Sequence, residues 1–130
     1  MHKVLVVEDS ASMRALVRAM LEDPEFADGL GGIEVSEASC GFEAMRLLPR
    51  GRFALVVTDI NMPDINGLEL IQFVRRSAHF GATPLVIIST QSTERDIERG
   101  LALGANAFVP KPFSKELLRA TCAKFLTGAG

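Results

Sequence analysis

The chain is poor in the residues that many metal and redox sites need. It has only two cysteines, Cys40 and Cys122, and neither belongs to a C-x-x-C or Cys/His spacing, so no zinc site is expected. Both thiols are expected to be reduced, as is usual in the cytosol. The two histidines, His2 and His79, stand apart in the sequence, and we expect both to be surface residues without a chemical role.

An excess of positive charge is absent as well. The chain has 14 basic and 16 acidic residues and a net charge of −2, whereas broad nucleic-acid binding requires a basic stripe. The strongly apolar runs are about four residues long, far short of a membrane span. The first of them begins almost at the N-terminus and leaves no room for a signal peptide. We therefore expect a cytoplasmic protein that contacts neither nucleic acid nor membrane.

The composition that remains is typical of one globular domain. The chain has 130 residues, of which 48% are hydrophobic and 23% are charged. Such a chain can bury a real core but is too short for two ordinary domains. Residues 1–130 are therefore expected to form a single domain, although a segment of a longer protein would show the same features.

Apolar runs of strand length alternate five times with stretches of helical period. The first helical stripe is Met13, Leu16, Val17, Met20 and Leu21, and the last is Leu117, Leu118, Thr121, Cys122 and Phe125. This alternation predicts an α/β fold in which helices cover both faces of a parallel sheet. Pro110 lies inside the last apolar run and cannot donate a ladder hydrogen bond, so that strand is expected at a sheet edge. Ser114 is expected to cap the last helix.

Polar residues follow four of the apolar runs. They are Glu8-Asp9, Asp59, Ser89-Thr90 and Lys111. In a parallel α/β sheet the carboxyl ends of all strands lie along one edge, where ligands bind. Three carboxylates, a hydroxyl and an ammonium group at that edge indicate a site for a divalent cation and a phosphoryl group.

Glu8, Asp9 and Asp59 are the candidate metal ligands. Three carboxylates close together repel one another unless a cation or a proton relieves the repulsion. Mg²⁺ suits the need, since it takes oxygen ligands and usually keeps waters and a phosphate oxygen in its shell. Calcium is a weaker candidate, because no loop offers the spaced ligands of a calcium cage. The alternative for Glu8-Asp9 is a helix N-cap, a position that Asp favours.

Asp59 is the candidate nucleophile for phosphoryl transfer. A carboxylate can attack phosphorus and form a mixed anhydride. Catalysis of that step is mostly positioning and charge neutralisation, which Lys111 can supply as a point charge. Ser89 can donate a hydrogen bond to a phosphoryl oxygen. The alternatives are a solvated surface lysine and a serine that only forms a turn.

Four motifs occur in an order and at spacings that are specific for one protein family. They are Val7-Glu8-Asp9-Ser10, the stretch from Asp59 to Gly67, Ile88-Ser89-Thr90 and Lys111-Pro112-Phe113. Over essentially its whole length, the chain resembles the receiver domain of two-component response regulators, in particular the chemotaxis-type, CheY-like members. The resemblance implies a flavodoxin-like, doubly wound sheet of five parallel strands in the order 2-1-3-4-5, with five helices.

The resemblance also implies a role for each matched residue. Asp59 would accept a phosphoryl group from the phosphohistidine of a sensor histidine kinase or a phosphotransfer protein. Asp9, Asp59 and the backbone carbonyl of Asn61 would bind Mg²⁺, and Glu8 would act through a metal-bound water. Lys111 would pair with the phosphoryl group, and its bond to the following proline would be cis, a form rarely found away from proline.

Ser89 and Phe108 match the switch positions of the family. A phosphoryl group adds about −1.5 to −2 charge; Ser89 would move toward it, and Phe108 would turn inward. The surface of the fourth helix, fifth strand and fifth helix would then bind a downstream protein effector. Asn61 and Gln91 match the positions that set the phosphate lifetime. The protein is thus expected to be a signalling switch that gains and loses its own phosphoryl group, not an enzyme with turnover.

Two other functions fit parts of the pattern. A haloacid-dehalogenase-like phosphatase also uses an Asp at a strand end, but it needs a second Asp two residues later, where this chain has Asn61. A receiver-like module that binds partners without phosphorylation is the other alternative, and the complete acidic triad and Lys111 argue against it. The loop from Asp23 to Gly32 is longer than is typical, as a tolerated insertion or as a partner contact through Phe26.

Overall fold

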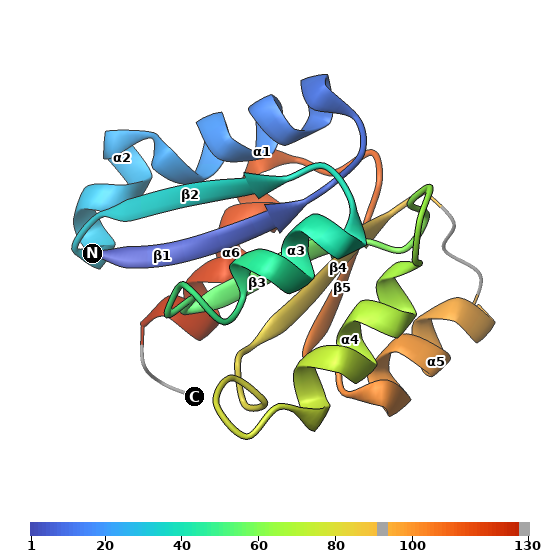
Figure 1. Ribbon diagram of the computed structural model, residues 1–130. Coiled ribbons are helices and arrows are strands. Elements are labelled where there is room, and N and C mark those ends of the chain that lie inside the picture. Colours follow the sequence, from blue (N-terminus) through green and yellow to red (C-terminus); the bar gives the residue numbers. More distant parts are fainter. Residues whose placement is uncertain (91–93, 128–130) are drawn as a thin grey trace.

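Five parallel strands form a sheet that lies between two layers of helices (Figure 1). The computed structural model describes residues 1–90 and 94–127. The strands are β1 (His2–Val7), β2 (Ile33–Ala38), β3 (Leu55–Asp59), β4 (Leu85–Ser89) and β5 (Ala107–Pro110). Their order in the sheet, β2-β1-β3-β4-β5, confirms the predicted flavodoxin-like topology.

The three central strands are β1, β3 and β4, and helices cover both of their faces. Every residue of β3 and β4 is buried, as are the last four residues of β1. Parallel strands covered on both sides need such continuous runs of Val, Leu and Ile. The register pairs Asp59 with Ile88 and Ser89 with Pro110. The polar residues at the strand ends are therefore brought to one edge of the sheet.

Among the described residues, three α-helices cover each face of the sheet. One face carries α1 (Ala11–Glu22), α2 (Pro24–Ala27) and α6 (Lys115–Leu126); the other carries α3 (Gly41–Leu47), α4 (Gly67–Arg76) and α5 (Glu94–Leu103). Ser10, Asn66 and Ser114 cap α1, α4 and α6 through their side chains, and Ser114 confirms the predicted cap. Within the described part of the chain, no helix combines the length and the apolar character that crossing a membrane requires.

The prediction of five helices is wrong, because the segment from Asp23 to Gly32 is not an irregular loop. Asp23 caps the extra helix α2, and a 3-10 helix, η1 (Asp28–Leu30), follows it. Phe26 packs against the core, and the Arg119 guanidinium of α6 lies over its ring, 5.3 Å from the ring centre. The aromatic residue that was a candidate for partner contact is therefore engaged within the chain.

The sheet divides the apolar core into two clusters. One cluster joins the inner sides of α1 and α6 to the sheet, with Val17, Leu21 and Leu118 fully buried, and the other lies beneath α3, α4 and α5. Leu16 and Leu117 were predicted to face the core, but each is 46% exposed. They lie at the margins of their helical stripes, and a helix that packs on a flat sheet buries only the centre of such a stripe.

The two edge strands differ in how they avoid unpaired, outward-facing backbone N–H groups. β5 ends at Pro110, which confirms that this strand lies at an edge and has no N–H at that position. On the opposite edge, the amide of Val35 in β2 donates to Glu22 Oε2 of α1 at 2.8 Å. An amide that the sheet ladder leaves unpaired is thus satisfied by a side chain.

Arg75, near the end of α4, connects the loops that lead into β4 and β5. Its guanidinium donates to the carbonyl oxygens of Gly81 at 2.9 Å, Thr83 at 2.6 Å and Gly104 at 2.6 and 3.0 Å, and to Asn106 Oδ1 at 2.9 Å. Gly104 follows α5 directly and has a φ of 119°, a backbone conformation that glycine adopts without strain. One side chain therefore organises the end of the sheet opposite the acidic residues.

We expect Arg75→Met to lower the free energy of unfolding by about 3 kcal/mol, because several partly buried acceptors lose their donor at once. Urea denaturation followed by circular dichroism measures the change. The matched control is Arg76→Met, since the neighbouring Arg76 is exposed and should change stability by less than about 0.5 kcal/mol. Equal effects of the two substitutions would contradict the role assigned to Arg75.

Candidate functional site

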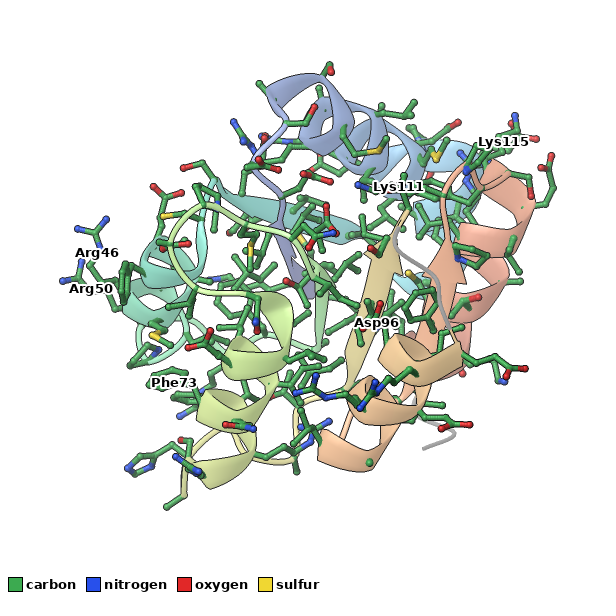
Figure 2. The ribbon with its side chains drawn as sticks, turned by 90° about the vertical axis from the view of Figure 1, so that its right-hand side faces the viewer. Arg46, Arg50, Phe73, Asp96, Lys111 and Lys115 are labelled. Atoms are coloured by element: carbon green, nitrogen blue, oxygen red, sulfur yellow. The ribbon has the colours of Figure 1, made fainter. Side chains whose placement is uncertain are left out.

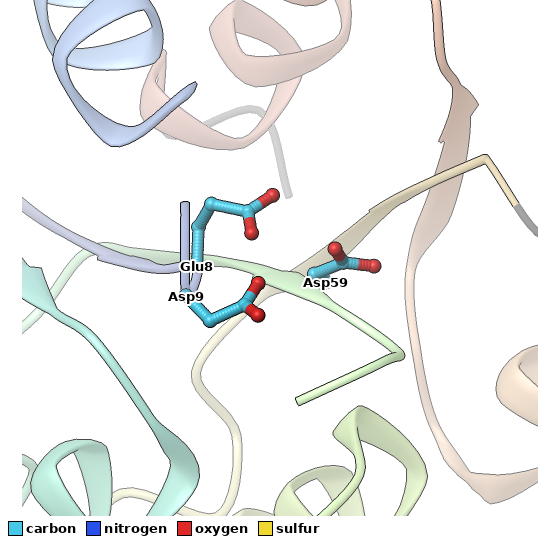
Figure 3. Close-up of side chains that lie close together, drawn as sticks. All are labelled: Glu8, Asp9 and Asp59. Carbon is cyan, nitrogen blue, oxygen red and sulfur yellow. The ribbon is translucent and has the colours of Figure 1, made fainter. Parts of the chain in front are cut away.

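Three carboxylates meet at the carboxyl edge of the sheet. Asp59 is the last residue of β3, while Glu8 and Asp9 follow directly after β1. One carboxylate oxygen from each lies within 4.8 Å of the others, and Figure 3 shows the side chains of Glu8 and Asp9 extending toward Asp59. Glu8 is 1% exposed and Asp59 is 7% exposed, whereas Asp9 is open to solvent. The structure thus brings together the three acids selected from the sequence.

The turn between β1 and α1 leaves the Asp9 carboxylate available to the site. Ser10 is the N-cap of α1, and its Oγ accepts a hydrogen bond from the Met13 amide at 3.3 Å. The Ser10 amide in turn donates to Glu8 Oε2 at 3.1 Å. The alternative in which Glu8-Asp9 serves as the helix cap is therefore wrong, and the Asp9 carboxylate faces Asp59 instead (Figure 3).

Backbone amides and a lysine hold the two oxygens of Asp59. Its Oδ1 accepts from the amides of Ile60 at 2.6 Å and Asn61 at 3.3 Å. Its Oδ2 lies 3.1 Å from Lys111 Nζ. Because both oxygens are held, the carboxylate has one defined orientation at the edge of the sheet.

Lys111 reaches the acids from the turn after β5. Its Nζ donates to Glu8 Oε1 as well as to Asp59 Oδ2, and its side chain is 10% exposed. The Lys111 amide donates to the carbonyl oxygen of Ser89 at 2.9 Å, which joins this turn to the end of β4. The bond from Lys111 to Pro112 is cis, as the resemblance implied.

The pKa values within the site reflect competition between burial and pairing. Burial is the largest cause that raises the pKa of Glu8, and the hydrogen bond from Lys111 offsets part of the effect. Burial acts to lower the pKa of Lys111, but hydrogen bonds and charge attraction from Glu8 and Asp59 outweigh it, so this pKa is raised. Lys111 is therefore held in its charged form between two carboxylates.

The residues of the site fit a magnesium ion. Lys111 supplies one positive charge against three carboxylates, so the cluster retains an excess of negative charge. The donors are all hard oxygens, and Asp9 is accessible from solvent, which suits an ion that keeps several waters. Asp9, Asp59 and the Asn61 carbonyl are the residues that would hold it, with Glu8 acting through a water.

The structure describes three of the four other predicted residues. Ser89 is fully buried at the end of β4. Phe108 lies on β5 opposite Ile87 and packs, half-buried, against the cluster beneath α3, α4 and α5. Asn61 is exposed and adjoins Asp59. Gln91 lies outside the described residues.

Arg14 is a supporting residue that sequence reasoning did not select. Its NH1 group donates to the carbonyl oxygens of Glu8 at 2.7 Å and Asp9 at 3.4 Å, and its Nε lies 3.2 Å from Glu37 Oε1. The side chain thereby fixes the backbone that carries two of the acids. Its position one helical turn after the Ser10 cap places Arg14 near the acids. The sequence does not show which groups its side chain contacts.

Gly67 allows α4 to begin against the backbone of Asp59. The Gly67 amide donates to the carbonyl oxygen of Ile60 at 2.7 Å. A Cβ at this position would lie 2.2 Å from the Asp59 carbonyl oxygen, so any side chain would push α4 away from β3. This close approach depends on tertiary structure and is not visible in the sequence.

Asp64 ties the loop after Asp59 to the beginning of α3. Its Oδ1 accepts from the Gly41 amide at 3.1 Å and its Oδ2 accepts from the Phe42 amide at 2.7 Å. Desolvation acts to raise the pKa of Asp64, but the backbone amides that donate to it outweigh this and lower the pKa to about 2. The ionised carboxylate therefore caps a helix that is distant in the sequence.

The sequence matches one protein family over most of its length. The response regulator receiver domain matches residues 4–123. A chemotaxis protein CheY homolog of Campylobacter jejuni is 34% identical, over 98% of this chain and 95% of its own length. The chemotaxis protein CheY1 of Helicobacter pylori is 35% identical over 90% of both chains.

Solved structures show the same likeness. The chemotaxis response regulator CheY4 of Vibrio cholerae has a TM-score of 0.84 and 34% sequence identity, and the comparison covers 96% of this chain and 98% of that one. The receiver domain of the Francisella response regulator 1452 has a TM-score of 0.86 at 24% identity over both full chains, which supports the fold alone.

We expect the Asp64 contact to make stability depend on pH at the acid end. Since the folded-state pKa is depressed, the contribution is fully present above about pH 4 and is lost as the pH falls toward about 2. Solvent screening limits it to about 1 kcal/mol, because Asp64 is exposed. Asp64→Asn should be less stable than the parent chain by this amount at pH 7 and equally stable near pH 2, measured by urea denaturation.

Asp28→Asn is the matched control, because Asp28 is an exposed residue of η1. It should leave the pH profile unchanged. A constant stability difference between the parent chain and Asp64→Asn across the whole pH range would contradict the electrostatic part of the Asp64 contact.

Proposed function

This chain belongs to the response regulator receiver family of two-component signalling, and we propose that Asp59 is its phosphoacceptor. The proposal depends above all on one observation. Asp59 lies 3.1 Å from Lys111 Nζ and next to Glu8 and Asp9, in a cluster with more negative than positive charge. Such a carboxylate is oriented for attack, beside a cation that can accept the charge of a phosphoryl group. The donor is the phosphohistidine of a sensor histidine kinase or a phosphotransfer protein.

The transfer exchanges one bond to phosphorus for another. One carboxylate oxygen of Asp59 attacks the phosphorus atom, and the P–N bond of the phosphohistidine breaks. Its electron pair returns to the imidazole ring, which takes up a proton. Lys111 neutralises charge on the phosphoryl oxygens, and the Ser89 hydroxyl donates to one of them. When bound, Mg²⁺ supplies further positive charge at these oxygens.

The phosphorylated state carries the signal through Ser89 and Phe108. The added charge, about −1.5 to −2, attracts the Ser89 hydroxyl, and Phe108 moves into the space that Ser89 leaves. Support comes from their positions: Ser89 contacts the Lys111 turn through its carbonyl, and Phe108 is half-buried on the next strand. The equilibrium between two shapes of the α5–β5–α6 surface then shifts, and a downstream protein effector binds one of them.

Because α2 is an additional element, α5 and α6 are the fourth and fifth helices of the pattern expected from the sequence. The protein acts as a switch that acquires and loses its own phosphoryl group, not as an enzyme that turns over a substrate. Asn61 is exposed beside Asp59, and together with Gln91 it sets the rate of phosphate loss. Neither side chain is ionised, so neither is a strong base for water.

Incubation with a small phosphodonor and Mg²⁺ should add one phosphoryl group to the protein, at Asp59. Asp59→Asn should gain none, because an amide oxygen is a poor nucleophile and forms no mixed anhydride. Intact-mass spectrometry followed by peptide mapping measures both. Absence of the adduct in the parent chain, or an equal adduct in the variant, would refute the assignment, and many turnovers of a phosphomonoester would favour the phosphatase alternative.

Removal of the Asp9 carboxylate should weaken Mg²⁺ binding by more than about tenfold in Asp9→Ala, since even residues that only support metal ligands contribute that much. The chain has no Trp or Tyr, so isothermal calorimetry is the appropriate measurement. Asp28→Ala, at an exposed position away from the site, should bind Mg²⁺ as the parent chain does. Unchanged affinity in Asp9→Ala would remove Asp9 from the metal shell.

A further inference from the structure

The turn that carries Glu8 and Asp9 lies between two regular elements and belongs to neither. β1 ends at Val7, and α1 begins at Ala11. The Glu8 amide donates to the carbonyl oxygen of Ala38 at 3.0 Å, which fixes the start of the turn against β2. The direction in which the Asp9 carboxylate leaves the turn therefore depends on further contacts.

Arg14 binds the carbonyl oxygens of this turn. Its NH1 group lies 2.7 Å from the Glu8 oxygen and 3.4 Å from the Asp9 oxygen. Because the guanidinium is planar and rigid, it holds the acceptors around it in a fixed arrangement. The Arg14 side chain is only 17% exposed, so water competes little for these bonds.

Glu37 of β2 holds the other side of the guanidinium. Its Oε1 accepts from Arg14 Nε at 3.2 Å, and its Oε2 accepts from Arg18 NH1 at 2.9 Å. The hydrogen bond from Arg18, supported by the one from Arg14, outweighs burial and lowers the pKa of Glu37, so this carboxylate is ionised. Since Glu37 lies opposite Val6 in the sheet, Arg14 is anchored to the strand beside the one that leads into the turn.

The two cations nearest the acids act on different atoms. Lys111, which lies beneath α1 in Figure 2, contacts the carboxylates of Glu8 and Asp59. In the described part of the chain, Arg14 has Glu37 as its ion-pair partner and none of the three acids. Arg14 therefore acts on the shape of the turn, whereas Lys111 acts on the charge of the cluster.

We propose that Arg14 is a positioning residue that sets the Mg²⁺ affinity of the acidic site, with Glu37 as its anchor. Arg14 holds the turn in the shape that presents the Asp9 carboxylate beside Asp59, so that these ligands are arranged before an ion arrives. Outer contacts that orient metal ligands contribute about ten- to a hundredfold to affinity. This inference rests on the Mg²⁺ site and the phosphoacceptor proposed above.

A positioning contact and a nearby positive charge predict opposite effects when Arg14 is removed. A guanidinium that acted through its charge alone would repel a second cation, so its loss would strengthen Mg²⁺ binding. Loss of a positioning contact leaves the Asp9 carboxylate in several orientations, which have to be ordered when the ion binds, so affinity falls. The sign of the change in affinity therefore distinguishes the two roles.

Isothermal calorimetry with magnesium chloride and the full chain provides the test. Arg14→Met should weaken Mg²⁺ binding by about tenfold. Arg14→Lys should weaken it as well, because one ammonium group cannot bridge the carbonyls and Glu37 as the guanidinium fork does. Arg18→Met is the matched control, since Arg18 lies on the same helix and pairs with the same carboxylate but donates its Nε to Glu22. Its affinity should stay within about twofold of the parent chain.

Variants of Glu37 test the anchor. Glu37→Ala should weaken Mg²⁺ binding, and Glu37→Gln should restore most of the affinity, because its amide oxygen can still accept from Arg14. When Glu37→Ala is combined with Arg14→Met, it should add little to the loss, since both substitutions remove the same contact. Fully additive losses would overturn the role of Glu37 as the anchor.

Amide shifts in nuclear magnetic resonance spectra, recorded on nitrogen-15-labelled protein without Mg²⁺, give a readout that does not depend on the ion. Arg14→Met and Glu37→Ala should each shift the amides of the turn from Glu8 to Ser10, whereas the control variant should leave them in place. Well-dispersed spectra identify the variants that are folded. Should Arg14→Met be unfolded, Glu37→Ala decides the test in its place.

Two results overturn the proposal: unchanged or tighter Mg²⁺ binding in folded Arg14→Met, and an equal loss of affinity in Arg18→Met. The parent chain separates these results from a failure of the proposed function. A parent chain that binds Mg²⁺ and gains a phosphoryl group at Asp59, beside an unaffected Arg14→Met, refutes the positioning role alone. A parent chain that does neither refutes the proposed function and with it this inference.

Discussion

Mutual repulsion among Glu8, Asp9 and Asp59 is the constraint that the rest of the structure has to satisfy. Their oxygens lie within 4.8 Å of one another, and two of the three side chains are buried. A single ammonium group, that of Lys111, bridges two of them. Buried like charges at this distance are tolerated only when the surrounding chain holds them in place. The excess negative charge of the site therefore attracts a further cation.

Contacts from several elements hold the three acids in place. Arg14 binds the carbonyls of the turn after β1, and the Ile60 and Asn61 amides hold one oxygen of Asp59. Gly67 lets α4 start directly against β3. Because each contact comes from a different element, displacement of the acids requires several packed elements to move together.

The sheet and its acidic edge were predictable because they follow from local patterns. Continuous apolar runs predict buried parallel strands, and polar residues at their ends predict a common edge, which is how Glu8, Asp59 and Lys111 were selected. The helix α2 was missed because a segment of four residues has too little periodicity to distinguish it from a loop. The roles of Gly67 and Arg75 were missed for another reason. Both depend on contacts with residues brought close only by the fold.

The two edges of the sheet have a consequence for how the protein behaves at high concentration. An open strand edge is a template on which another chain can add a strand and begin to aggregate. Here Pro110 has no amide to offer on one side, and on the other Glu22 already occupies the Val35 amide while Glu34 adds an exposed charge. Extension of the sheet from one chain to another is therefore disfavoured at both edges.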